Sequence, residues 1–425
     1  MGAAANRAGG DLRNYILVTA AYWADTLADG ASRMLVLFYF FERGYSPFEV
    51  ASLFLFYELF GIITNLVGGF LAARIGLKAT LFGGLGTQVV ALGMLAVVPD
   101  AWLVAPYVMA AQALSGIAKD LTKMSSKSAV KLVVPKGEGE EGTLYKWVAV
   151  LTGSKNALKG VGFFVGGVLL TLTSFQTALL LLAGMVLAVL IATALLMQGG
   201  LGTVDKGARF RHMFSNNPAV NKLAAARVFL FASRDVWFVV GLPVYLRTVL
   251  DWSFWEVGGF LAIWVIGYGI VQASAPRFVR RRADEGGEPD GRTATWLAFA
   301  LAAFPAGIAI ALTAGFDPAT VLVSGLIAFG VIFAMNSAVH SYLILSFADN
   351  DKVAMNVGFY YMANAGGRLM GTILSGLLYQ WEGLVACLWA SVLFVLLAGV
   401  LSLSLPGGKP SRSTGFRPDR RLVMR

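Results

Sequence analysis

Residues 144–197 read LYKWVAVLTGSKNALKGVGFFVGGVLLTLTSFQTALLLLAGMVLAVLIATALLM, two long apolar stretches joined by a short polar turn. The stretches 144–173 and 175–197 are each long enough to cross the hydrocarbon core of a bilayer as a helix. The first carries Lys155 and Lys159 near its middle, four residues apart and therefore on one helical face. A charge at that depth costs about 2.5–3.5 kcal/mol even on the gentlest scale, so both lysines are expected to face protein or water.

The composition of the whole chain agrees with this segment. Of 425 residues 57% are hydrophobic and only 14% are charged, and the mean hydropathy is +0.70. Soluble domains carry about 25% charged residues, so a single membrane bundle is expected instead of several soluble domains. One cysteine and two histidines are too few for a disulfide framework or a metal centre, and we expect neither a metal nor a cofactor.

Twelve apolar spans can be counted along the chain, six on each side of a polar stretch. We place the spans at 14–41, 48–74, 79–98, 101–124, 144–173, 175–197, 223–249, 253–276, 293–314, 318–347, 353–380 and 383–405. The predicted parts are a cytoplasmic N-terminus at 1–13, a six-helix half at 14–197, a cytoplasmic central loop at 198–222, a six-helix half at 223–405 and a cytoplasmic, disordered tail at 406–425.

Lysine and arginine are distributed asymmetrically about these spans. With the N-terminus in the cytoplasm, 24 of them lie on the cytoplasmic side and only Arg43 and Arg247 lie outside. We therefore expect a multi-pass protein of the plasma (inner) membrane with both termini cytoplasmic. This topology signal accounts for most of the net charge of +10. No basic stripe with interleaved aromatic residues indicates nucleic-acid binding.

Positive charge is also in surplus inside the spans. The cations there are Arg33, Lys119, Lys123, Lys155, Lys159, Arg227, Arg234 and Arg368. The carboxylates are Asp25, Asp29, Glu58, Asp120 and Asp235. Buried ionisable groups of this kind mark substrate or ion pathways, and a cationic surplus indicates an anionic substrate.

Every third span carries no charge: 79–98, 175–197, 293–314 and 383–405. This pattern predicts that these four spans face lipid at the outside of the bundle. The remaining eight are expected to line a central cavity between the two halves, with the substrate site near the midplane.

The candidate substrate-binding residues are those that lie deepest in the charged spans. They are Lys155, Asn156, Lys159, Arg234, Asn364 and Arg368, with Lys119 and Lys123 near the cytoplasmic end of their span. For Lys119 and Lys123 the alternative is that they extend to the cytoplasmic headgroups. The glycines after the lysine pair, Gly160, Gly162, Gly166 and Gly167, let helices approach closely or let the span bend.

A second set contains the candidates for proton transfer or gating. It consists of Asp25, Asp29, Arg33, Glu58, Asp120, Asp235 and His340. Buried carboxylates can titrate near neutrality. The structural alternatives are an ion pair between Arg33 and Asp29 along one helix, and a packed, hydrogen-bonded His340. Arg234 and Asp235 are neighbours that should point in different directions, so at least one should pair with another helix.

Two motifs resemble those of the major facilitator superfamily. The loop from Gly69 to Lys78 keeps Gly69, Arg74, Gly76 and Lys78 of the cytoplasmic loop motif, with Ala73 in place of aspartate and Leu77 in place of a basic residue. The stretch 162–167 is similar to the antiporter motif of the fifth span, with Phe163 where proline is usual. The resemblance implies an all-α, twelve-span bundle of two six-helix halves around a central cavity.

A narrower resemblance covers residues 11–405. The segments that carry it, 14–35, 112–135, 142–167, 226–240 and 252–272, are similar to the ArsJ organoarsenical efflux permeases. That resemblance implies export of 1-arseno-3-phosphoglycerate and resistance to arsenate. The ester is made when glyceraldehyde-3-phosphate dehydrogenase uses arsenate in place of phosphate, which implies functional coupling to that enzyme. Outside the cell the ester decays to arsenate and 3-phosphoglycerate.

Two oxyanions on one ligand would require two cationic clusters. Lys155 and Lys159 in the first half and Arg234 and Arg368 in the second are the expected pair. One alternative is a transporter of another phosphorylated organic anion or a drug. A remote alternative is an integral-membrane enzyme or receptor, but the longest loops offer no catalytic constellation and we expect no enzyme. The sequence leaves open whether export is coupled to an ion.

Overall fold

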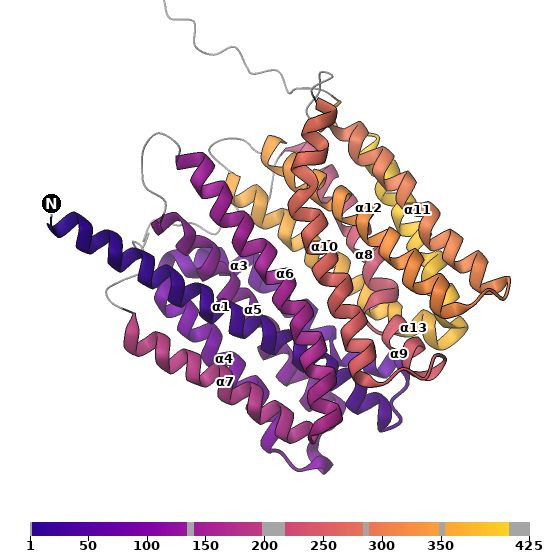
Figure 1. The fold of residues 1–425 in the computed structure, drawn as a ribbon, viewed down its shortest axis with the longest axis horizontal. Coiled ribbons are helices and arrows are strands. Elements are labelled where there is room, and N and C mark those ends of the chain that lie inside the picture. Colours follow the sequence, from indigo (N-terminus) through magenta and orange to yellow (C-terminus); the bar gives the residue numbers. More distant parts are fainter. Residues whose placement is uncertain (1, 134–139, 198–216, 284–288, 348–352, 408–425) are drawn as a thin grey trace, which may run out of the picture.

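The computed structural model describes residues 2–133, 140–197, 217–283, 289–347 and 353–407. Every regular element within these ranges is helical. Figure 1 shows a helical bundle in which the N-terminal helices form one side and the C-terminal helices the other. The elements are α1 (Gly2–Glu42), α2 (Pro47–Leu53), α3 (Leu55–Ile75), α4 (Leu77–Val97), η1 (Asp100–Trp102), α5 (Ala105–Val133), α6 (Glu140–Leu172), α7 (Phe175–Leu196), α8 (Pro218–Phe238), α9 (Gly241–Thr248), α10 (Phe254–Ala283), α11 (Gly291–Thr313), α12 (Pro318–Phe347) and α13 (Val353–Ser402).

Twelve spans emerge when the breaks between these helices are considered. α2 and α3 together form one span, as do α8 and α9. α13 contains two spans, because Gly383 has φ 70° and ψ −163° and turns the chain without a loop. A positive φ of this kind is readily adopted only by glycine. The predicted turn between 380 and 383 is therefore made by this one residue.

Hydropathy alone identifies eight of the helical segments in the described residues as long and apolar enough to cross a membrane. The segment 359–402 is one of these and holds two spans. α1, α5 and α8 are not among the eight. These three helices carry buried ionisable residues, among them Asp25, Asp120 and Arg227. Charged side chains that point into the protein therefore keep these three helices out of the apolar set.

Several helices continue beyond the apolar spans. α1 begins at Gly2, α5 continues to Val133, and α10 continues to Ala283. Hydropathy marks only the part of a helix that crosses hydrocarbon, so these extensions carry no apolar signal. Most of the predicted central loop (198–216) and tail (408–425) lies outside the described residues.

Glycines bring α6 into close contact with helices of both halves. A Cβ on Gly162 would lie 2.5 Å from the Leu27 carbonyl oxygen of α1, and one on Gly160 would lie 2.8 Å from the Ala262 carbonyl oxygen of α10. Neither position has room for a larger side chain. The expected close approach at these glycines is confirmed, and it fixes the helix that carries Lys155 and Lys159.

The two halves are joined at the end of the bundle where α1 finishes and α2 begins. The Arg247 Nε donates to Glu42 at 3.3 Å, and the Phe48 backbone N–H donates to the Gln380 side-chain oxygen at 3.3 Å. Toward the opposite end, contact between α5 and α12 is slight at most within the described part of the chain. The halves therefore meet more closely at one end than at the other.

A cationic cavity between the two halves

A cavity lies between the halves, and six helices line it. Its lining residues come from α1, α6, α8, α10, α12 and the first part of α13. α4, α7, α11 and the second part of α13 contribute none of the described lining residues. α4 and α7 lie on one flank of the bundle and α11 on the opposite one (Figure 1). The four charge-free spans are therefore remote from the cavity, as their pattern predicts.

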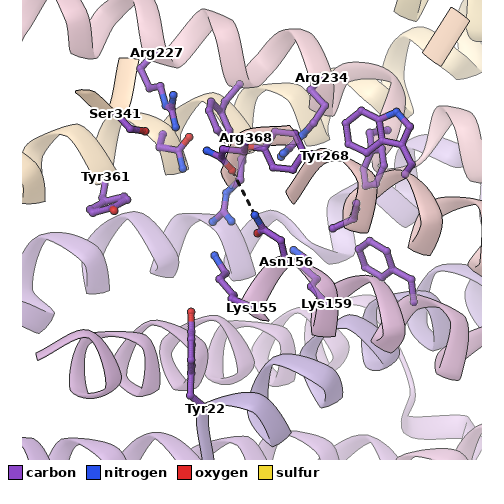
Figure 2. A pocket seen from close by; sticks show the side chains of 17 residues that line it. Tyr22, Lys155, Asn156, Lys159, Arg227, Arg234, Tyr268, Ser341, Tyr361 and Arg368 are labelled. Atoms are coloured by element: carbon purple, nitrogen blue, oxygen red, sulfur yellow. Dashed lines mark hydrogen bonds between the residues drawn. The ribbon is translucent and has the colours of Figure 1, made fainter. Parts of the chain in front are cut away.

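The six deepest candidate residues all line this cavity. Lys155, Asn156 and Lys159 come from α6, Arg234 comes from α8, and Asn364 and Arg368 come from α13. Figure 2 shows Lys155 and Lys159 pointing from α6 toward the side that carries Arg234 and Arg368. Asn156 Nδ2 donates to Gln272 Oε1 of α10 at 3.4 Å. The cavity thus brings together polar residues from both halves.

Arg368 is held by a carboxylate of the other half. Glu58 Oε2 of α3 lies 2.8 Å from Arg368, while its Oε1 lies 3.2 Å from Arg33 of α1. Glu58 is 1% exposed, so its carboxylate is almost completely desolvated. An ion pair therefore joins the two halves behind the cavity, and Arg368 enters the site with its charge largely compensated.

The expected pairing of Arg33 with Asp29 is wrong. Arg33 pairs with Glu58, and its guanidinium lies over the Tyr57 ring at 4.6 Å. Asp29 instead accepts a hydrogen bond from the Tyr57 hydroxyl. The reason is the apposition of α1 and α3, which supplies each α1 residue with a better-placed partner than its own helix does.

Lys119 and Lys123 belong to a closed network of α3 and α5 and do not line the cavity. Lys123 pairs with Asp120 and donates to Asn65 Oδ1 at 2.5 Å. Lys119 lies 3.9 Å from Asp120, and its ammonium lies 4.0 Å from the centre of the Tyr57 ring. Lys123 is buried, so it does not extend to headgroups either. Both lysines compensate Asp120 in place of contacting the cavity directly.

Arg234 and Asp235 pair with each other, which corrects the expectation that they point in different directions. Arg234 lies 2.5 Å from Asp235 Oδ1. The arginine side chain is long enough to fold back to its neighbour, and its guanidinium also lies 5.1 Å from the Phe231 ring centre. Arg234 therefore borders the cavity as one half of an ion pair.

Two cations of the cavity have no carboxylate within 4.0 Å among the described residues: Lys159 and Arg227. Lys159 lies 5.7 Å from the Phe163 ring centre. Arg227 is 4% exposed, donates to the Ser337 carbonyl oxygen at 3.1 Å, and lies over the Phe231 ring at 4.1 Å. Sequence reasoning recognised Arg227 as a buried charge but did not place it in the site. The signal that could have placed it is the lack of any acidic residue near it on its own helix.

Asp25 and His340 are the most isolated of the remaining candidates. Both are fully buried, and neither lines the cavity. Both carboxyl oxygens of Asp25 and both ring nitrogens of His340 have no hydrogen-bond partner among the described residues. His340 is packed as expected, but it lacks the expected hydrogen bond.

The residues of the loop motif lie at the junction of α3 and α4, away from the cavity. Gly76 has φ 92°, which requires glycine, and Arg74 is exposed at the end of α3. Lys78 Nζ donates to the Met197 carbonyl oxygen at 3.5 Å. Gly69 lies within α3. No group of three or more His, Cys, Asp or Glu residues that could hold a metal occurs in the described residues.

Residues 18–372 match the family model of the Major Facilitator Superfamily. The chain belongs to this superfamily. No curated protein matches its sequence.

Solved structures of other transporters share the fold of this major facilitator protein. A POT family transporter in complex with a thioalcohol-conjugated peptide has a TM-score of 0.73 at 12% identity, covering 92% of this chain and 95% of that one. A bacterial homologue of the iron transporter ferroportin is 17% identical, with TM-scores of 0.68 in its inward-facing state and 0.64 in its outward-facing state. Each of these two matches covers 92% of this chain and 98% of that one. At such low identity the likeness extends to the fold alone.

Proposed function

We propose that this major facilitator protein exports an organic anion by alternating access, and that the anion is 1-arseno-3-phosphoglycerate. Export of this ester would confer resistance to arsenate. The observation that supports an anion most directly is the cavity between the halves, which is lined by cations from both. The identity of the ester rests on the resemblance of residues 11–405 to the ArsJ permeases.

The chemistry of this ligand matches the cavity. The ester carries a phosphate at one end and an arsenate at the other, so it presents two oxyanions. Arginine offers a planar fork to an oxyanion and lysine a compact charge with three donors. The proposed binding residues are Lys155, Asn156, Lys159, Arg234, Asn364 and Arg368. Lys119 and Lys123 would support the site from behind through Asp120.

The cellular setting follows from the substrate. Glyceraldehyde-3-phosphate dehydrogenase would supply the ester, so the two proteins would be coupled through their common metabolite. We propose that the permease lies in the plasma (inner) membrane with both termini in the cytoplasm. Its working parts would be the halves 14–197 and 223–405, with the terminal segments 1–13 and 406–425 and the loop 198–222 on the cytoplasmic side.

In this orientation the closely joined end of the bundle faces outward, and the cavity is approached from the cytoplasm. An inside-negative potential is worth about 2.3 kcal/mol per charge per 100 mV and drives an anion outward. Export of a polyanion therefore needs no coupled ion. Asp25, Asp29 and Glu58 would carry a proton only if export were coupled to proton entry.

Arsenic uptake into everted membrane vesicles tests this proposal. Vesicles containing the chain would receive arsenate with and without glyceraldehyde 3-phosphate, NAD and the dehydrogenase, and vesicles lacking the chain serve as the control. We expect accumulation only with the complete mixture. Uptake of arsenate alone would contradict the proposed substrate. No uptake into vesicles that hold folded protein would also overturn it, and would favour another phosphorylated organic anion or a drug, to be identified by a screen.

A further inference from the structure

Arg227 is a buried cation whose charge no described carboxylate compensates. The other described cations with ion-pair partners in the spans are bound to Glu58, Asp120 or Asp235. Arg227 has instead a backbone carbonyl at 3.1 Å and two aromatic rings, and its Nε has no hydrogen-bond partner. An isolated buried charge is costly unless a partner compensates it. The free-energy cost of burying Arg227 is offset if an anionic substrate that enters and leaves the cavity serves as its partner.

The surroundings of Arg227 form a polar site within the cavity. Ser337, whose carbonyl binds Arg227, also receives hydrogen bonds on its hydroxyl from Tyr268 and Gln272, each at 3.2 Å. Tyr268 and Gln272 line the cavity beside Arg227. Asn364 lies in the same lining, and its side-chain oxygen has no hydrogen-bond partner. Arg227 thus donates to the carbonyl of a serine that two further hydrogen bonds hold in place, and polar atoms of the lining are left available.

More unpartnered polar atoms lie behind this site on α12. Asn336 and His340 are one helical turn apart and fully buried, and none of their side-chain polar atoms has a hydrogen-bond partner. Buried polar groups in native proteins are normally hydrogen-bonded. Unpartnered polar groups are therefore concentrated around one uncompensated arginine, as expected where a polar ligand binds.

Lys159 is the counterpart of Arg227 across the cavity. It comes from α6 in the first half, whereas Arg227 comes from α8 in the second. Figure 2 shows the two side chains on opposite sides of the same cavity. Lys159 also lacks a carboxylate within 4.0 Å among the described residues. Each half therefore supplies one cation that is free to bind an anionic group.

We infer that Arg227 and Lys159 hold opposite ends of a substrate that carries two anionic groups, and that Arg227 is the anchor in the second half. This inference rests on the proposed transport of an organic anion. Arg368 and Arg234 also line the site, but Glu58 and Asp235 already compensate their charges, so Arg227 is the main anchor of that half. A ligand with one anionic group would satisfy only one anchor and would leave the other charge buried and unpaired.

Binding of three probes to the purified full chain tests this assignment by calorimetry. The probes are 3-phosphoglycerate, which has two anionic groups, and glycerol 3-phosphate and glycerate, which have one each. We expect the wild-type protein to prefer 3-phosphoglycerate at least tenfold. Arg227→Gln and Lys159→Gln should each reduce this preference to less than threefold. Arg292→Gln, on the exposed start of α11, should leave it unchanged.

Arg227→Lys controls for loss of folding, because it keeps the positive charge and should retain part of the preference for 3-phosphoglycerate. Arg227→Gln should also unfold within a few degrees of the wild-type protein, since it removes an uncompensated charge. A tenfold preference that persists in folded Arg227→Gln would overturn the assignment while leaving anion transport intact. Failure of the wild-type protein to bind any of the three probes would overturn both.

Discussion

Glu58 is the residue on which the polar interior depends most. It is the only described carboxylate that pairs with cations of both halves, Arg33 and Arg368. Removing one partner of a buried ion pair leaves an uncompensated charge and typically costs about 3–5 kcal/mol. The two possible deletions are not equivalent. Loss of Glu58 leaves two arginines without an ion-pair partner, whereas loss of Arg368 leaves Glu58 paired with Arg33.

We therefore predict that Glu58→Gln destabilises the protein far more than Arg368→Gln does. The measurement is the thermal unfolding midpoint of the purified variants. Glu382→Gln, at an exposed position, provides a matched control and should unfold with the wild-type protein. Equal shifts for Glu58→Gln and Arg368→Gln would show that Glu58 does not hold both arginines.

At the scale of single residues, the depth of a charged side chain within its span could be predicted, but its ion-pair partner could not. Counting along the span placed Lys155 and Lys159 in the cavity, because helical spacing fixes both face and depth. The partner of Arg33 was missed because it lies 25 positions away on another helix. Lys119 and Lys123 were expected at the substrate, and their pairing with Asp120 was missed, because Asn65 of another helix completes that network.

Among the elements, α6 packs closely against helices of both halves. Its glycines face α1 on one side and α10 on the other, so the helix is fixed between them. Adding atoms to a well-packed interface costs about 1–3 kcal/mol. Gly162 tests the packing of α6 within one half, because a Cβ there would lie 2.5 Å from the Leu27 carbonyl oxygen and 3.1 Å from the Ala31 backbone nitrogen.

Gly162→Ala should lower the unfolding midpoint, whereas Gly184→Ala on α7 should not. Gly184 lies in a helix of the same half, but a Cβ added to it meets no atom within 4 Å. Both changes add the same methyl group and the same gain in helix propensity. The comparison therefore isolates packing, and equal midpoints for the two variants would contradict the close approach of α1 and α6.

The elements themselves were the most predictable part of the chain. The charge-free spans correctly predicted which helices lie away from the cavity, since a lipid-facing helix cannot carry an unpaired charge. The ends of α1, α5 and α10 were not predictable, because helices continue into water without an apolar signal. The division of one span into α8 and α9 near Val239 was also missed, although Pro243 marks it: a proline has no N–H to donate to the carbonyl oxygen of Val239, four residues earlier.

For the whole molecule, the proposed alternating access requires the joined end of the bundle to open during transport. Phe48 and Gln380 lie there, one in each half, and are linked by a hydrogen bond of 3.3 Å. Alternating access requires such contacts to break once per cycle. A covalent link at this position should hold the molecule in one state.

Cross-linking Phe48→Cys to Gln380→Cys should abolish transport, and reduction should restore it. Cys387 is the only native cysteine and is buried, so its replacement by alanine provides the background. The readout is arsenic uptake into everted vesicles before and after treatment with a short thiol cross-linker. Each single-cysteine variant is the control. Full transport by a fully cross-linked protein would contradict opening at this end.

We propose that cations of the cavity bind the anionic substrate. The most direct measurement compares arsenic uptake into everted vesicles supplied with the complete ester-forming mixture, for the wild-type protein, Lys159→Gln, Lys159→Arg and Glu382→Gln. We predict at least a tenfold loss for Lys159→Gln, substantial retention for Lys159→Arg and no change for Glu382→Gln. If Lys159→Gln took up arsenic as the wild-type protein does, at equal amounts of folded protein, the proposed role of the cavity cations would be contradicted.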